Sequence, residues 1–349
     1  MQTIIQETLD IPLRWTELIA RNPTPRSELD SAVANFKRVL IDADRQALKN
    51  NNIVPARLDA DVEDAFRTCN AKLHAVESEI SKGNNELGAR LQSDLLPYLL
   101  LTNTAERWYS KPRGYAGDYL TIHQMYQNVP AGRGRIGSIL DRCFLNLPAA
   151  VAVRNRRPLL AQEINAVVSA KQGAPARVTS LACGPAAELF DVYDKLEDPA
   201  KLTATLIDVD LQALAFVGER RDQARLQKQM RLVNANLVYL VTEKETIDLR
   251  DQDLIYSIGL IDYFSDKFVI KLLNYVHKAL LPGGKVILGN FHPRNPDKPM
   301  MDYVLDWRLI HRTEDDMNRL FRASAFGSDC SNVRFEEQGI NLFAECVKQ

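Results

Sequence analysis

Short apolar runs rich in β-branched residues alternate with longer helical segments from Arg177 to the end of the chain, and this alternation constrains the fold most strongly. Parallel strands joined by crossover helices produce such a pattern. The first run is expected to form a buried strand over Val178–Ala182, and the fifth a strand over Lys285–Asn290. Two final runs meet at Gly339 and predict an antiparallel pair at the sheet edge. The sequence therefore predicts an α/β fold with seven strands in its second half, residues 147–349.

The first hundred residues carry apolar side chains at intervals of three and four, which is the spacing of one helix face. Thr24 and Pro25 look like an N-cap and a first helical residue. Such stripes pack helical bundles, and they also allow a homodimer through these helices. We predict a helical N-terminal domain and substrate lid over residues 1–146. The stripes are Leu29, Val33, Phe36 and Leu40; Leu58, Val62, Phe66, Cys69, Leu73, Val76 and Ile80; and Leu87, Leu91, Leu95 and Leu99.

Charge and composition exclude several classes of function. The 44 Lys and Arg residues nearly balance the 45 Asp and Glu residues, so no overall positive field attracts nucleic acid. The five cysteines form no CxxC pair and the five histidines show no HxxxH spacing, which disfavours a metal site. No apolar run reaches the roughly 18 residues of a membrane span and no signal peptide is evident, so we expect a cytoplasmic protein.

Polar and glycine residues follow the expected strands where a ligand would bind. Gly184 lies in a tight strand-to-helix turn, where the absence of a side chain lets backbone amides approach a ligand. Asp208 ends the next strand, where a carboxylate can accept hydrogen bonds from ribose hydroxyls. Asn236 follows the third strand and could contact adenine. The pattern indicates a nucleoside-containing cofactor.

The ordered segments LACGPAAEL, LIDVD, DLIYSIG and LLPGGKVIL, with the terminal hairpin, resemble the class I S-adenosylmethionine-dependent methyltransferases. The resemblance covers residues 147–349 and implies a seven-stranded Rossmann-like sheet with S-adenosylmethionine as cofactor. In that family the first turn lies beside the methionine part, the acid of the second strand holds the ribose, and the third strand flanks adenine. The implied cofactor residues are Ala182, Gly184, Pro185, Asp208, Val209, Asn236, Ser257 and Gly259.

The first motif departs from the usual pattern of this family. Ser180 stands where an acid is common, and Ala182 and Ala186 stand where glycines are common. A dinucleotide oxidoreductase is the alternative, but it would favour GxGxxG directly after its first strand, whereas this turn has one glycine.

The segments RWYSKPRGYAGDYLTIHQMY, SIGLIDYF and DWRLIHRT further resemble a bacterial group of hydroxypalmitic acid methyl ester biosynthesis proteins. This resemblance implies methyl transfer to a carboxylate, or to another oxygen, of a small metabolite. N- or C-methylation of a natural-product intermediate and a non-catalytic cofactor-binding or scaffold protein are the alternatives. The exit of the fourth strand lacks NPPY and DPPY, the pattern that base- and amide-directed N-methyltransferases share. DNA bases and protein glutamine are therefore disfavoured as methyl acceptors.

The chemistry of the acceptor decides which catalytic residues are needed. A carboxylate acceptor is ionised at neutral pH and needs an anion clamp, for which Arg113 in the glycine-rich loop is the candidate, or else a partner of Asp118. A hydroxyl or amine would need a base, for which His292 after the fifth strand is the candidate, unless it only bonds loop backbone. Tyr263 is a third catalytic candidate. The expected substrate-binding residues are Arg107, Tyr115, Asp118, Asp262, Arg308 and Arg312.

Overall fold

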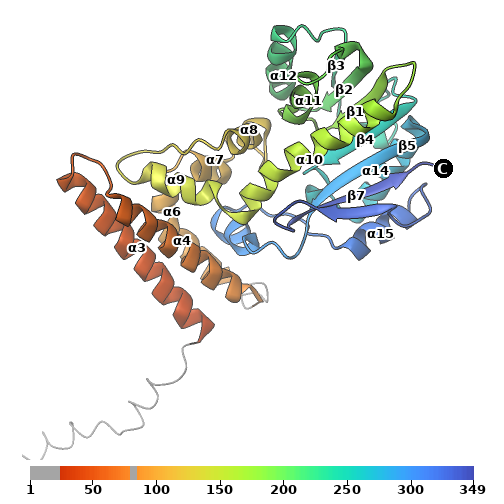
Figure 1. The fold of residues 1–349 in the computed structure, drawn as a ribbon. Helices are drawn as coiled ribbons and strands as arrows, with labels where there is room; N and C mark the ends of the chain where they lie inside the picture. The colour runs from red at the N-terminus through yellow and green to blue at the C-terminus, as the bar shows by residue number, and fades with distance from the viewer. Residues whose placement is uncertain (1–23, 79–84) are drawn as a thin grey trace, which may run out of the picture.

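The computed structural model describes residues 24–78 and 85–349. Helices from the first half of the chain form one part of the molecule, and a sheet with helices on both faces forms the other (Figure 1). The long helix α10 (Pro148–Ala170) runs from the helical part along the sheet (Figure 1). The predicted helical region therefore precedes an α/β unit in the chain.

The helical part begins as the sequence predicts. Thr24 caps α3 by accepting a hydrogen bond from the Ser27 N–H at 3.2 Å, and Pro25 is the first helical residue. The predicted stripes are buried from Leu29 to Val76 and from Leu87 to Leu99, whereas Ile80 lies outside the described residues. The helices are α3 (Pro25–Lys49), α4 (Ala56–Ala75), α6 (Asn85–Leu99), α7 (Thr104–Ser110), α8 (Tyr119–Gln127) and α9 (Gly137–Leu145).

The second half forms one mixed sheet with the strand order β3-β2-β1-β4-β5-β7-β6. The first five strands in the chain are parallel, and β7 pairs antiparallel with both β5 and β6. The predicted seven strands and the antiparallel terminal pair are thus confirmed. The strands are β1 (Ala176–Leu181), β2 (Leu202–Asp208), β3 (Met230–Asn234), β4 (Gln252–Ile258), β5 (Leu280–Phe291), β6 (Asn332–Phe335) and β7 (Asn341–Val347).

Strand β5 starts earlier than the sequence predicts. The expected strand begins at Lys285, but β5 begins at Leu280 and includes the Pro-Gly-Gly turn at 282–284. Gly283 has a φ of 81° and donates a backbone hydrogen bond to the Lys348 carbonyl at 2.8 Å. The register against β4 shifts between Gln252 and Leu254, which absorbs the extra residues. The turn is therefore a bulge within the strand.

Helices cover both faces of the sheet. Alternate residues of β4 face opposite sides, so Tyr256 packs with α10, α11 and α12 while Ile255 packs with α14 and α15. The strand order reverses between β1 and β4, and at such a point the carboxyl ends of parallel strands leave a crevice. The remaining helices are α11 (Ala187–Tyr193), α12 (Leu211–Gln223), α13 (Leu237–Val241), α14 (Asp266–Ala279) and α15 (Glu314–Arg322), with short turns η1 (Pro199–Lys201) and η2 (Ile261–Tyr263) and a π-helical turn η3 (Met300–Val304).

The core of the helical part also includes residues from the second half of the chain. Phe291, Met300 and Trp307 belong to the same buried cluster as the stripes of α3, α4 and α6. The η3 turn packs against α6, where a Cβ added to Gly88 would lie 3.0 Å from the Tyr303 ring. The division into domains at residue 147 stays a prediction, because the helical core is completed by this later segment.

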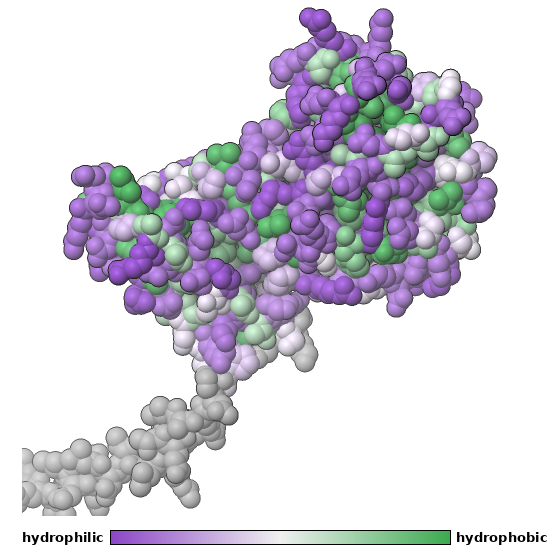
Figure 2. Space-filling view, viewed as in Figure 1, coloured by the Kyte–Doolittle hydropathy of each residue, from purple (hydrophilic) through white to green (hydrophobic). Residues whose placement is uncertain are grey.

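Polar and charged residues cover most of the face drawn in Figure 2, with hydrophobic residues scattered between them. Across residues 24–78 and 85–349, no helix combines the length and the apolar character needed to cross a membrane. The cytoplasmic location and the homodimer stay predictions.

Candidate active site

The turn between β1 and α11 is built from left-handed backbone. Ala182, Gly184 and Ala186 have φ values of 54°, 52° and 48°, so the chain reverses sharply within five residues. A Cβ added at Gly184 would meet no atom within 4 Å, so its backbone conformation and the open space in front of it explain the glycine. The turn presents its backbone to the crevice at the sheet edge.

Asp208 ends β2 and holds this turn in place. Its Oδ2 accepts a hydrogen bond from the Gly184 N–H at 2.9 Å, and its Oδ1 accepts one from the Asp210 N–H at 2.9 Å. Burial raises the pKa of Asp208, and these backbone donors partly offset the rise. A carboxylate has about four acceptor sites, and the Cys183 Sγ, 3.9 Å from Oδ2, also uses one of them, so the capacity left for a ligand is mainly on Oδ1. Asp208 therefore fixes the turn after β1 and can still accept a hydrogen bond from a ligand.

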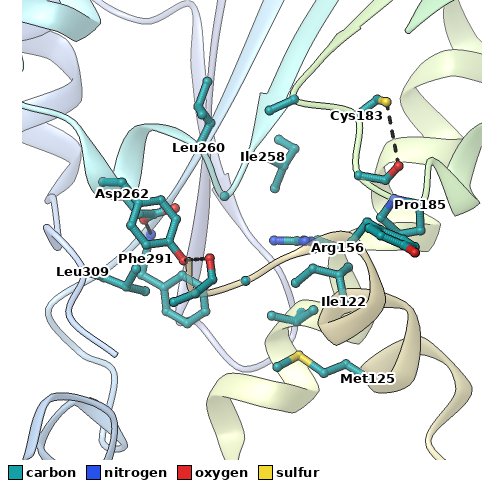
Figure 3. Close-up of a pocket in the computed structure, with 18 of the residues that line it drawn as sticks. Ile122, Met125, Arg156, Cys183, Pro185, Ile258, Leu260, Asp262, Phe291 and Leu309 are labelled. Carbon is teal, nitrogen blue, oxygen red and sulfur yellow. Dashed lines mark hydrogen bonds between the residues drawn. The ribbon is translucent and has the colours of Figure 1, made fainter. Parts of the chain in front are cut away.

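A cavity of about 410 Å³ opens at this edge of the sheet, between the strand ends and the helical part. One end is lined by Asp208 at the end of β2 and by residues that follow β1, β2 and β4, namely Gly184, Val209 and Gly259. The other end is mostly apolar, and Figure 3 shows side chains from α8, the β4 exit and the β5 exit converging on it. The apolar wall includes Trp108, Ile122, Met125, Leu147, Val153, Leu160, Phe291, Met301, Trp307 and Leu309.

Two buried charged residues of the cavity were missed by the sequence analysis. Arg156 of α10 is 7% exposed and Glu188 of α11 is 5% exposed. The Glu188 Oε1 accepts a hydrogen bond from the Tyr256 hydroxyl at 2.7 Å. A signal for Arg156 existed in the sequence, because it lies at the helical spacing of Val153 and Leu160, on the buried stripe of α10. An arginine on an apolar stripe marks a polar site inside the fold.

Asp262, expected to bind substrate, and Tyr263, the third catalytic candidate, follow β4 and line the cavity. The Asp262 Oδ1 accepts a hydrogen bond from the Phe291 N–H at 2.7 Å, and burial raises the pKa of its carboxyl group to about 6. The Tyr263 hydroxyl accepts a hydrogen bond from the Trp307 Nε1 at 2.8 Å and donates one to the Ala116 carbonyl at 3.2 Å. Tyr263 therefore connects the β4 exit with the glycine-rich loop.

The glycine-rich loop, residues 111–118, covers the cavity from the helical part. Tyr115, Ala116 and Gly117 line the cavity. Arg113 does not line it, because its guanidinium group pairs with Asp210 just beyond the strand-end acid, with Nε 2.9 Å from Oδ2. The loop thus joins β2 and β4 across the mouth of the cavity.

Arg107 and Asp118 pair with each other outside the cavity. The Arg107 Nη2 lies 2.6 Å from the Asp118 Oδ1, and Arg107 Nε donates to the Thr121 hydroxyl at 3.1 Å. Asp118 is also the N-cap of α8 and accepts from the Leu120 N–H at 2.9 Å. The two residues fix the end of the glycine-rich loop.

His292 lies outside the cavity lining, and both of its ring nitrogens have partners. The Nε2 lies 3.0 Å from the Glu314 Oε2, and the Nδ1 accepts from the Arg294 N–H at 3.1 Å. Because a backbone N–H can only donate, Nδ1 carries no proton and Nε2 donates to the carboxylate. The imidazole is held against the start of α15, outside the cavity lining.

The remaining predicted residues also lie outside the cavity lining. Arg312 is 2% exposed and bonds Asp266, Asn290 and two backbone carbonyls, so it supports the β4 and β5 exits. The Arg308 side chain is 75% exposed. The Asn236 side chain caps α13 by accepting from the Val238 N–H, and the Ser257 hydroxyl donates to the Leu181 carbonyl.

Residues 114–345 match a protein family described as "Putative methyltransferase". This match covers more than half of the chain. The chain belongs to this methyltransferase family. Its parallel sheet with an antiparallel last pair is the class I arrangement, and S-adenosylmethionine is the cofactor of the class. The methyltransferase is therefore an enzyme that uses this cofactor.

The methyltransferase is also similar to individual proteins. It is 24% identical over 245 residues to the Escherichia coli (strain K12) protein named "Uncharacterized protein YnbC", covering 66% of this chain and 40% of that protein. A structure from Bordetella parapertussis, described as a possible exported protein, has a TM-score of 0.56 and 18% identity, covering 93% of this chain and 97% of that one. The magnesium protoporphyrin IX methyltransferase from Synechocystis PCC 6803 with bound SAH has a TM-score of 0.47 and 9% identity, covering 70% of this chain and 98% of that one.

Proposed function

We propose that the enzyme transfers the methyl group of S-adenosylmethionine to a carboxylate, or to another oxygen, of a small apolar acceptor. One observation carries this proposal. A single cavity runs from the strand-end acid Asp208 to a chamber with mostly apolar walls. A cofactor and an acceptor can therefore lie end to end in it, with the transferred group between them.

The strand ends supply the groups that the cofactor needs. Gly184 leaves its turn open to the methionine part, and the Oδ1 atom of Asp208 keeps acceptor capacity for a ribose hydroxyl. Val209 is 62% exposed, which offers adenine an apolar surface beside this acid. The cofactor supplies a methyl group on a positively charged sulfur, which is already activated for displacement.

The enzyme then has to position the acceptor and exclude water. The chamber walls from α8, α10 and the β5 exit dehydrate an apolar acceptor, and the loop at 111–118 closes the mouth through Tyr115 and Tyr263. A carboxylate acceptor requires no base. A hydroxyl acceptor could pass its proton to Asp262, whose pKa of about 6 leaves it mainly ionised at neutral pH.

Calorimetry with S-adenosylhomocysteine tests the cofactor part of the proposal. Asp208→Ala should weaken binding about ten- to a hundredfold, because hydrogen bonds to a charged acceptor are lost. Asp198→Ala is a matched control, since Asp198 only caps the turn at the opposite end of β2. Folded wild-type enzyme that binds no S-adenosylhomocysteine, or that prefers NAD, would overturn the cofactor assignment.

A methyl-transfer screen tests the acceptor part. Apolar carboxylic acids, phenols, alcohols and amines of similar size are incubated with the enzyme and radiolabelled S-adenosylmethionine. Methyl esters are the expected products, and methyl ethers would fit the Asp262 alternative. Methylated amines or C-methylated products would favour the other transfer classes, and cofactor binding without transfer to any acceptor would favour a non-catalytic protein.

A further inference from the structure

Arg156 is a buried cation whose terminal nitrogens face the cavity. Its Nε donates to the Tyr126 hydroxyl at 3.3 Å, and within the described residues the guanidinium group makes no ion pair. Figure 3 shows the side chain reaching into the cavity between Ile258 and Ile122. Burying a charge without a partner of opposite sign is costly, so such a group is normally paired or hydrogen-bonded.

The neighbouring arginine on the same helix, Arg157, has a carboxylate partner, in contrast to Arg156. Arg157 pairs with Asp191 through both Nε and Nη2, each at 2.6 Å, and does not line the cavity. Arg113 at the mouth of the cavity pairs with Asp210 in the same manner. Arg156 is more deeply buried than either and lacks the carboxylate that both of them have.

The buried acids around Arg156 keep it charged without binding it. Glu188 accepts its hydrogen bond from Tyr256, and Asp262 accepts from the Phe291 N–H. Burial lowers the pKa of Arg156, but the hydroxyl of Tyr126 and the fields of Glu188 and Asp262 raise it above its usual value overall. The cation therefore persists, with its donors available.

Gly259 at the β4 exit has no side chain, and this leaves room for the Arg156 guanidinium group. A Cβ at this position would lie 2.9 Å from the Arg156 Nη1, and the φ of Gly259 is 86°. The glycine thus lets the guanidinium group lie directly beside the strand end that separates the cofactor end of the cavity from the apolar chamber. A planar group held there can offer two parallel N–H donors to one carboxylate.

We propose that Arg156 binds a carboxylate inside this cavity. The inference rests on the proposed function, because that function provides two ligands with such a group. One is the amino-acid carboxylate of S-adenosylmethionine, and the other is the carboxylate of an apolar acceptor. The chemistry is the same in both cases, and the experiment separates the two sources.

The cofactor source is tested by pairing a change in the protein with a change in the ligand. Wild type and Arg156→Met are titrated with S-adenosylhomocysteine and with S-adenosyl-3-thiopropylamine, which lacks only its carboxylate. Wild type should prefer S-adenosylhomocysteine about ten- to a hundredfold, and Arg156→Met should lose that preference while binding the amine as wild type does. Arg156→Lys should keep part of it, because the charge remains but the fork is lost.

The acceptor source is tested in the same way with simple probes. Octanoate and octanol are titrated into enzyme saturated with S-adenosylhomocysteine. If the acceptor carboxylate is the ligand, wild type should prefer octanoate about ten- to a hundredfold, and Arg156→Met should bind the two probes equally. Arg157→Met is the matched control in both arms, because it removes an adjacent arginine that pairs with Asp191 and does not line the cavity.

The outcomes separate this inference from the function on which it rests. Loss of carboxylate preference in either arm supports the assignment and names its source. If Arg156→Met weakens a probe and its carboxylate-free analogue equally, or changes neither preference, the assignment is wrong and Arg156 only supports Tyr126. Wild type that lacks both preferences overturns the assignment as well, without any variant. Wild type that fails to bind S-adenosylhomocysteine overturns the proposed function instead, and the octanoate arm is then run on the apo enzyme.

Discussion

Arg113 and Asp210 connect the glycine-rich loop to the turn that follows β2. The Arg113 Nε lies 2.9 Å from the Asp210 Oδ2, and the Tyr115 hydroxyl donates to the same oxygen at 2.8 Å. Asp210 in turn donates its N–H to Asp208 at 2.9 Å. A residue 97 positions earlier in the chain is thereby bonded to the segment that carries the strand-end acid. The position of the loop and the geometry of Asp208, the acid that we propose for the ribose, are therefore linked through Asp210.

Arg113→Ala should therefore loosen the loop. We expect S-adenosylhomocysteine to dissociate faster and to bind about three- to thirtyfold more weakly, because a partly exposed ion pair contributes less than a buried one. Stopped-flow displacement measures the rate. Arg135→Ala is the matched control, since Arg135 forms a two-point pair with Asp44 in the helical part. If only the Michaelis constant of a carboxylate acceptor rises, Arg113 is the acceptor clamp that the sequence suggested.

Gly117 and Gly114 offer a matched pair of loop substitutions. Both have positive φ values, 73° and 83°, so alanine strains the backbone at either position. Only at Gly117 would the new Cβ collide, lying 2.8 Å from the Tyr263 hydroxyl and 3.3 Å from Trp307. Gly114→Ala should cost about 1 kcal/mol of stability with near-normal turnover. Gly117→Ala should also displace Tyr263 and reduce turnover. Equal kinetics in the two variants would show that the contact of Tyr263 with the glycine-rich loop does not affect turnover.

His292→Ala should leave the chemical step almost unchanged. Its ring is bonded on both sides, to Glu314 and to the Arg294 N–H, and it lies outside the cavity lining. We expect a lower melting temperature from the loss of these bonds and single-turnover rates close to wild type. A hundredfold or greater fall in the single-turnover rate of a folded variant would restore His292 as the base.

The residues that line the proposed cofactor end of the cavity could be identified from the sequence because their signals are local. Gly184 and Asp208 each follow an apolar run, and strand ends of a parallel sheet meet at one edge. Of the residues proposed for the cofactor, Ala182, Pro185, Val209 and Gly259 line the cavity with them. Asn236 and Ser257 do not, because their side chains are used by the α13 cap and by the Leu181 carbonyl.

The residues at the proposed acceptor end could not be predicted to the same degree because they meet only through tertiary packing. Arg156 comes from a helix before the sheet and Asp262 from the β4 exit, so no spacing rule links them. The partner of Arg113 was equally hidden, since Asp118 was the nearer acid in sequence and Arg107 occupies it instead. The acid with which a long basic side chain pairs depends on the tertiary structure, and the periodicity of the sequence carries no information about it.

Comparison of Asp262→Asn with wild type should reveal how ionisation of Asp262 changes the stability of the protein with pH. Burial raises the pKa of Asp262 from 3.8 to about 6, although Arg156 and Arg312 pull it down. A raised pKa means that the folded state favours the protonated form, so the contribution of Asp262 to stability is present below pH 4 and is lost as the pH rises through 6. The full difference corresponds to about 3 kcal/mol.

The variant carries no such group, and its Oδ1 can still accept from the Phe291 N–H. The stability of Asp262→Asn relative to wild type should therefore increase between pH 4.5 and pH 7.5, whatever fixed cost the substitution has at both values. Urea unfolding at the two pH values measures the difference. Asp64→Asn, which removes an exposed carboxylate from α4, should show little change. A constant difference for Asp262→Asn would mean that Asp262 is ionised throughout this range. The charges of the two arginines and the Phe291 N–H would then lower its pKa by more than burial raises it.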